Sequence, residues 1–205
     1  MKLYAALCTV FSVSLVVADL VAPRLTTIGP FTFTSGMVAF PVTFILTDLV
    51  HELWGAKAAR DMTWMGLGAS LLSLGIVAIA LQLPAAPVGL PPEVFAQAFG
   101  GSALVITASL SAYVVSQLLD IAVFSIVSRY GFLARATVST FLSQAVDTLV
   151  FVAIAFGWLG WQVASGVAVS LYVAKAIAAL LAVPVLALTR RLIRGANPLA
   201  HGSLQ

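Results

Sequence analysis

The chain has 205 residues, of which 61% are hydrophobic and only 8% are charged, and its formal net charge is +3. A soluble domain carries about 25% charged residues, so this composition excludes a soluble globular protein. Long apolar runs recur from end to end, which indicates an all-α, polytopic membrane protein embedded in a lipid bilayer. We expect a single transmembrane helical-bundle domain over residues 1–205.

The apolar runs predict six transmembrane helices joined by short links. We expect these spans at residues 3–21, 36–53, 62–83, 103–127, 137–156 and 164–188. The first span follows a basic start and contains a permissible cleavage site at Val16-Val17-Ala18, so a cleaved signal peptide is the alternative for that segment. Pro41 lies inside the second predicted span, where it favours a kink or a broken helix.

The predicted links differ in character. Residues 23–35 form a polar, turn-rich link, and residues 54–61 form a basic loop. The link at 84–102 is the longest. Within it, Pro91-Pro92 followed later by Gly100-Gly101 is typical of a short helix with a Pro start and a Gly stop, which could cap one mouth of the bundle.

Basic residues gather on one side of this six-span scheme. The opposite side carries Arg24 alone, whereas this side would carry Lys2, Lys57, Arg60, Arg129, Arg135, Arg190, Arg191 and Arg194. The positive-inside rule predicts that this side, with both termini, is cytoplasmic, and we expect the cell inner membrane as the location. The basic charge therefore reflects membrane orientation and not a nucleic-acid partner.

The stretch Phe40–Arg60 places two carboxylates in an otherwise apolar run. Asp48 and Glu52 are four residues apart, so they project from one face of a helix. A carboxylate near the centre of a membrane helix costs roughly 2.5–3.5 kcal/mol, so such residues usually face the bundle interior or a polar cavity. We expect both carboxylates to point inward.

A second pattern, S-Q-x-x-D-x-x-x-F, occurs twice, at Ser116–Phe124 and at Ser143–Phe151. Its Ser, Gln and Asp share one helix face, because they are three or four residues apart. The two predicted spans run in opposite directions, so we expect them to cross at the motif with Asp120 and Asp147 at similar depth. Lys175 in the last span would then be the counter-charge for one aspartate. Interhelical hydrogen bonding is the alternative role for the single Ser and Gln side chains.

Enzyme activity is not expected from these residues. His51-Glu52 begins like a zinc-binding H-E-x-x-H motif, but Gly55 stands where the second His is needed. No Cys/His cluster supports a metal elsewhere, and no P-loop indicates a nucleotide cofactor. Asp120 and Asp147 lack the glycine-rich catalytic loop that an intramembrane aspartyl protease would place beside them. We expect no metal and no cofactor.

Several of these motifs resemble the queuosine precursor transporter family, a vitamin-uptake-like group similar in layout to the substrate-binding subunits of energy-coupling-factor transporters. The resemblance lies in F-P-x-x-F-x-x-T-D-L at Phe40–Leu49, W-G-x-x-x-A-R at Trp54–Arg60, S-Q-x-x-D at Ser116–Asp120, S-T-x-x-S-Q-x-x-D-T at Ser139–Thr148, and the Lys of the last span. It implies import of 7-cyano-7-deazaguanine and 7-aminomethyl-7-deazaguanine for queuosine salvage in tRNA.

The resemblance also implies a set of substrate-binding residues: Asp48, Glu52, Gln117, Asp120, Gln144, Asp147 and Lys175. A guanine-like edge presents adjacent N–H donors to a carboxylate, and its carbonyl oxygen needs a donor such as an amide or ammonium group. Aromatic side chains could stack on the ring, with Phe44, Tyr113, Phe124 and Phe151 as candidates. The alternative is a substrate-binding subunit for another vitamin or nucleobase that works with an ATP-driven energy-coupling module. A membrane scaffold without transport and a homo-oligomer also stay open.

Overall fold

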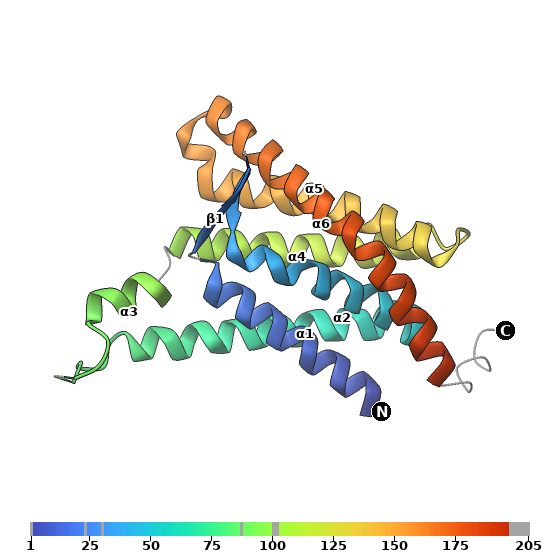
Figure 1. The fold of residues 1–205 in the computed structure, drawn as a ribbon, viewed down its shortest axis with the longest axis horizontal. Coiled ribbons are helices and arrows are strands. Elements are labelled where there is room, and N and C mark those ends of the chain that lie inside the picture. Colours follow the sequence, from blue (N-terminus) through green and yellow to red (C-terminus); the bar gives the residue numbers. More distant parts are fainter. Residues whose placement is uncertain (1, 23, 30, 87, 100–102, 197–205) are drawn as a thin grey trace.

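The computed structural model describes residues 2–22, 24–29, 31–86, 88–99 and 103–196. Its elements pack as a bundle of long helices (Figure 1). In chain order they are α1 (Lys2–Val21), strands β1 (Leu25–Ile28) and β2 (Phe31–Thr34), a 3-10 helix (Ser35–Ala39), α2 (Phe40–Ala80), α3 (Pro92–Phe99), α4 (Ala103–Ile126), α5 (Phe132–Phe156), a second 3-10 helix (Gly157–Leu159) and α6 (Trp161–Ala196).

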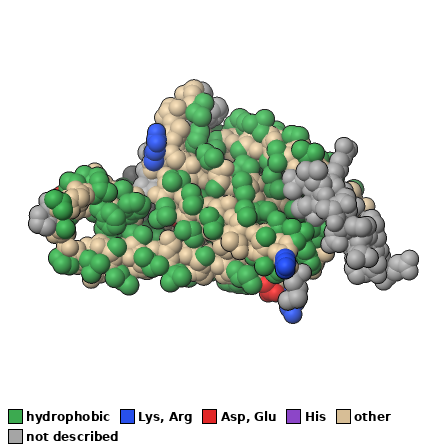
Figure 2. All heavy atoms as spheres, turned by 60° about the horizontal axis from the view of Figure 1, so that its bottom comes forward, with side chains coloured by type: hydrophobic (Ala, Val, Ile, Leu, Met, Phe, Trp, Pro, Cys, Tyr) green, Lys and Arg blue, Asp and Glu red, His purple; other side chains and the backbone are tan. Residues whose placement is uncertain are grey.

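The outer surface is apolar and the interior holds the polar groups, the reverse of a soluble protein. Leu72 and Ile79 are each 65% exposed, whereas Asp48 is 2% exposed and Asp120 is fully buried. Figure 2 shows one face covered by apolar side chains, with few charged ones. Within the described residues, five helices are long and apolar enough to cross a membrane. The structure therefore confirms a helical, multi-pass membrane protein.

One of these five helices is too long for a single crossing. It covers Ser35–Ala80, 46 residues. At about 1.5 Å per residue this is roughly 69 Å of helix, more than twice the ~30 Å hydrocarbon core of a bilayer. Helical geometry is interrupted inside it at Gly55, whose φ of 84° and ψ of 174° suit glycine and few other residues.

The chain reverses direction at Gly55. The start of the segment lies beside the end of α1, because a Cβ at Gly36 would come within 2.4 Å of the Ala18 carbonyl oxygen. Near the reversal, the Tyr4 hydroxyl at the other end of α1 donates to the Ala58 carbonyl, 3.1 Å away. Further along, Ser70 donates to Asp19, back at the end of α1. Figure 1 shows the two parts of α2 running in opposite directions.

The predicted basic loop at residues 54–61 is therefore wrong in form. Those residues are helical on both sides of one glycine, so the reversal needs no loop. The kink predicted at Pro41 is also absent, because Pro41 lies in the first turn of α2, where a missing N–H costs nothing. The 3-10 helix that precedes it changes to α-helix at this point.

The remaining links show smaller differences from expectation. The predicted turn-rich link contains an antiparallel hairpin in which Leu25 pairs with Thr34 and Ile28 with Phe31. The short helix α3 is confirmed, but it buries no residue and stands away from the bundle, so it does not cap a mouth (Figure 1). α5 begins at Phe132, which places Arg135 inside a helix and not in a loop.

Two apolar clusters hold the helices together. One lies between α1, α2 and α4 and includes Phe11, Leu15, Met62 and Tyr113. Gly66 permits this close contact, because a Cβ there would lie 2.6 Å from the Phe11 ring. The other cluster contains Phe124, Phe132, Ala136 and Leu186 from α4, α5 and α6. Lipid tails are as apolar as these side chains, so tight packing, more than the hydrophobic effect, favours their association.

Candidate functional site

A cavity of about 520 Å³ lies between α2, α5 and α6. This volume includes the open space at the mouth of the cavity. Most of its wall is apolar, and three ionisable or amide side chains break that surface. The lining residues are Met37, Pro41, Phe44, Ile45, Asp48, Ala136, Thr137, Thr140, Phe141, Gln144, Lys175, Ala178, Ala179, Ala182, Val183 and Leu186.

One face of α6 forms a third wall of the cavity. Its lining positions are Lys175 and then residues 178, 179, 182, 183 and 186, which recur every three or four residues as one helix face requires. The alanines at 178, 179 and 182 leave the space that a larger side chain would fill. The cavity therefore depends on small residues on the inner face of this helix.

Two polar atoms at the cavity have no hydrogen-bond partner among the described residues. These are Oδ1 of Asp48 and Oε1 of Gln144, both buried. Buried polar atoms in native proteins are nearly always paired, so unpaired ones beside a cavity call for an explanation, such as a ligand. Both atoms are acceptors, so the cavity is prepared for a molecule with N–H or O–H donors.

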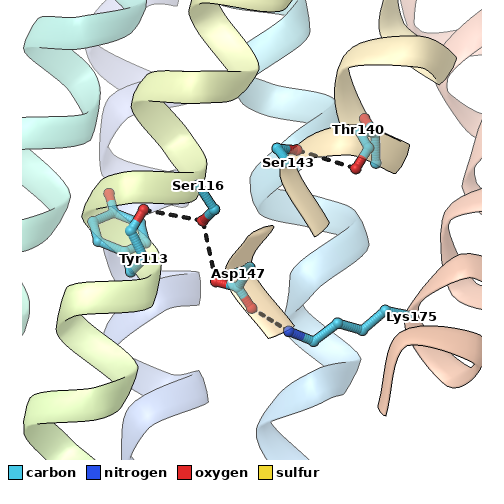
Figure 3. A network of polar contacts seen from close by, with 6 residues as sticks. All are labelled: Tyr113, Ser116, Thr140, Ser143, Asp147 and Lys175. Carbon is cyan, nitrogen blue, oxygen red and sulfur yellow. Dashed lines mark hydrogen bonds and ion pairs between the residues drawn. The ribbon is translucent and has the colours of Figure 1, made fainter. Parts of the chain in front are cut away.

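The two S-Q-x-x-D motifs contact each other reciprocally where α4 and α5 cross. Ser116 of the first motif donates to Oδ1 of Asp147 over 3.1 Å, and Ser143 of the second donates to Oδ1 of Asp120 over 3.2 Å. Figure 3 shows this crossing around Asp147. The structure confirms the predicted crossing, and all four side chains are buried.

Lys175 is the counter-charge of Asp147. Its ammonium forms an ion pair with Oδ2 of the carboxylate, and both side chains are almost fully buried (Figure 3). The predicted pairing of Lys175 with one of the two aspartates is confirmed. Because the same lysine lines the cavity, this ion pair joins the motif crossing to the cavity wall.

A second ion pair lies one residue before the cavity wall on α5. Nη1 of Arg135 is 3.3 Å from Oε2 of Glu52, and its Nε donates to the Phe124 carbonyl. The guanidinium also stacks over the Phe124 ring at 4.0 Å. Nε2 of His51 lies 3.2 Å from the Ser125 hydroxyl. Since Ala136 follows Arg135 and lines the cavity, this cluster lies next to the cavity wall.

The structure distributes the predicted site residues over three places. Asp48, Gln144 and Lys175 line the cavity. Asp120, Asp147 and Gln117 are buried behind its wall, where the Gln117 carbonyl accepts from Thr47 over 3.1 Å.

Two predicted residues lie outside the cavity lining, with other contacts. Glu52 pairs with Arg135. Tyr113 donates to the Thr63 carbonyl over 2.9 Å and packs in the cluster of α1, α2 and α4. Across the described residues, no three His, Cys, Asp or Glu side chains come together as metal ligands.

Sequence reasoning did not single out several lining residues, above all Phe141, Thr140 and Met37. Phe44, an expected stacking candidate, does line the cavity. Thr137, Thr140, Phe141 and Gln144 follow helical spacing, so extending the face of Gln144 along α5 would have found the first three. Met37 lies in the 3-10 helix before α2, where no such periodicity applies.

Helices with an apolar exterior enclose a mostly apolar hollow, and ionisable groups turn inward toward it. This arrangement defines a membrane transport protein, in which such groups mark a pathway for substrate or ions. Residues 34–189 match the family model described as "Putative vitamin uptake transporter". The chain belongs to this family of transporters, which are not enzymes.

Two curated proteins are similar to this chain. A "Probable queuosine precursor transporter" of Bacillus subtilis (strain 168) is 30% identical over 159 residues, which cover 75% of this chain and 69% of that protein. A "Queuosine precursor transporter" of Escherichia coli (strain K12) is 34% identical over 132 residues, which cover 60% of this chain and 55% of that protein. No solved structure matches the chain.

Proposed function

We propose that this protein imports queuosine precursors, the cyano- and aminomethyl-substituted deazaguanines, across the cell inner membrane. The observation that carries the proposal is the cavity in which Asp48 and Gln144 present unpaired acceptor atoms beside apolar and aromatic walls. The names of the two curated relatives support the same class of substrate. The single transmembrane bundle acts as one domain in this function.

The chemistry of the cavity suits a flat, neutral base. A guanine-like edge carries adjacent N–H donors, which Asp48 would accept, and the Gln144 carbonyl would take a further donor. The ring carbonyl needs a donor, which the Lys175 ammonium supplies from the α6 wall. Phe44 and Phe141 offer ring faces for stacking. In this scheme Asp147 orients Lys175, and Asp120 and Gln117 support the site from behind the wall.

Six membrane crossings with both termini in the cytoplasm complete the proposal. The length of α2 and its reversal at Gly55 both support two crossings by this one helix. Two contacts, of Tyr4 with Ala58 and of Glu52 with Arg135, bring separate helices together near the reversal. They support the placement of the nearby basic residues, including Lys57, at one common end of the bundle. The positive-inside rule assigns that end to the cytoplasm.

Single cysteines test this orientation in a Cys8→Ser background. Val88, which is 83% exposed beyond the end of α2, should react as Val88→Cys with an impermeant maleimide added to intact cells. Lys57→Cys, exposed near the reversal, should react only after the membrane is permeabilised. Labelling of both positions from the same side would contradict six crossings.

Ligand binding tests the substrate and the cavity together. Purified protein should be stabilised against heat by either deazaguanine, by about 2.7 kcal/mol when the ligand is present at 100 times its Kd. Ala182→Phe should abolish this stabilisation, because the ring would occupy the cavity.

The neighbouring Leu181→Phe is the matched control, since Leu181 is 70% exposed on the outer face of the same helix turn. It should bind the bases as the wild type does. Wild-type protein that neither base stabilises would contradict the proposed function.

A further inference from the structure

In the two copies of the S-Q-x-x-D motif, the Ser and Asp side chains make matching contacts except at one carboxylate oxygen. In each copy, Oδ1 of the aspartate accepts from the serine of the other copy. Oδ2 of Asp147 is held by the ammonium of Lys175. The equivalent Oδ2 of Asp120 is buried and has no partner among the described residues. A positive charge is therefore present at one of two matching positions.

The charges in this region do not balance. The charged groups in the neighbourhood of Asp48 and Asp120 comprise four carboxylates and two cations: Asp48 and Glu52 on α2, Asp120 on α4, Arg135 and Asp147 on α5, and Lys175 on α6. The two ion pairs use both cations, and they leave the carboxylates of Asp48 and Asp120. His51, next to Glu52, places its Nε2 against a serine hydroxyl. Unpaired charges buried away from water are strongly unfavourable.

We propose that Asp120 is the binding site of a coupling proton, which enters the cell together with the substrate. The proton takes the place at Oδ2 of Asp120 that the Lys175 ammonium takes at Oδ2 of Asp147. A proton needs only this one oxygen, whereas a metal cation needs several oxygen ligands. Asp120 is fully buried and lies outside the cavity lining, so the substrate does not displace the proton.

The coupling follows from the repulsion between Asp48 and Asp120, which interact electrostatically. Asp48 must be ionised to accept two N–H groups from the base, and a second negative charge on Asp120 opposes this. A proton on Asp120 removes that opposition, so proton and base each strengthen the binding of the other. One proton is bound from outside and released inside with the unchanged base. This inference rests on the proposed function.

Proteoliposomes that contain the purified full chain test the coupling. With the medium more acidic than the lumen, radiolabelled cyano-deazaguanine should accumulate, and a dye in the lumen should report proton entry when the base is added. In Asp120→Asn, whose amide cannot release a proton, accumulation should fall at least tenfold.

The pH dependence of binding tests the same proton at equilibrium. Above the pH at which Asp120 ionises, the wild-type Kd for the base should rise about tenfold per pH unit, which is the slope for one linked proton. Asp120→Asn should lack this slope.

Asp19→Asn is the matched control, because Asp19 is another carboxylate of the helical bundle, bonded to Ser70 away from the cavity. It should accumulate the base as the wild type does. Accumulation by Asp120→Asn, or accumulation driven by a sodium gradient without a pH gradient, would overturn the proton site. In both cases the base still binds, so the proposed function would survive.

A second measurement needs no substrate. The infrared spectrum of the purified wild type at neutral pH should contain the carbonyl stretch of a protonated carboxyl group that is absent from Asp120→Asn and retained in Asp19→Asn. Identical spectra for wild type and Asp120→Asn would refute the proton on Asp120. If the base does not bind the wild type at any pH, the proposed function fails, and the infrared result alone decides the proton site.

Discussion

Replacing Lys175 by methionine should cost about 3–5 kcal/mol of folding stability and abolish uptake of the base. The buried ammonium is the ion-pair partner of Asp147, and its removal leaves that carboxylate charged and uncompensated inside the bundle. Methionine has a similar length, so the loss reports the charge more than the packing. Thermal unfolding in detergent, followed by uptake measurements at matched membrane levels, would detect both effects.

The double variant Lys175→Met/Asp147→Asn separates the stability effect from the transport effect. It removes the uncompensated charge of Asp147, so most of the lost stability should return. Uptake should stay absent, because the cavity still lacks its ammonium donor. Lys57→Met, which removes an exposed lysine near the reversal of α2, should change neither quantity. A single Lys175→Met variant as stable as the wild type would show that this ion pair does not compensate a buried charge.

Asp48→Asn should weaken binding of the deazaguanine by roughly ten- to a hundredfold. The substitution preserves shape but replaces an anionic acceptor with an amide that presents a donor to the N–H groups of the base. Hydrogen bonds to charged groups are worth about 1.5–3 kcal/mol, and each 1.4 kcal/mol is a factor of ten in Kd. Titration of purified protein with the base, at one fixed pH, gives the ratio of the two dissociation constants directly.

Asp19→Asn again provides the comparison, since it removes a carboxylate of the same kind whose partner is Ser70. Its Kd should equal that of the wild type within about twofold, because binding effects of sites without shared partners are independent. If Asp48→Asn binds the base as tightly as the wild type, the unpaired Oδ1 of Asp48 at the cavity has no role in recognition of the base.

Helix periodicity and charge placement carry information that is local in the chain. They were sufficient to predict the helical membrane class, the inward direction of the carboxylates and the crossing of the two motifs, because residues three or four apart share a helix face. The pairing of Lys175 with an aspartate also followed, since a buried cation at that depth needs an anion.

Tertiary packing decided which of these residues border the cavity. Gln117 and Gln144 occupy the same position in identical motifs, yet only Gln144 lines it, because α5 packs against both α4 and α6 and turns its own motif toward the hollow. The predicted spans at 36–53 and 62–83 placed a reversal between them, but its reduction from a loop to one glycine was beyond local pattern, since the flanking residues are good helix formers on both sides. Such features depend on which helix faces meet, and that is set by contacts between segments far apart in the sequence.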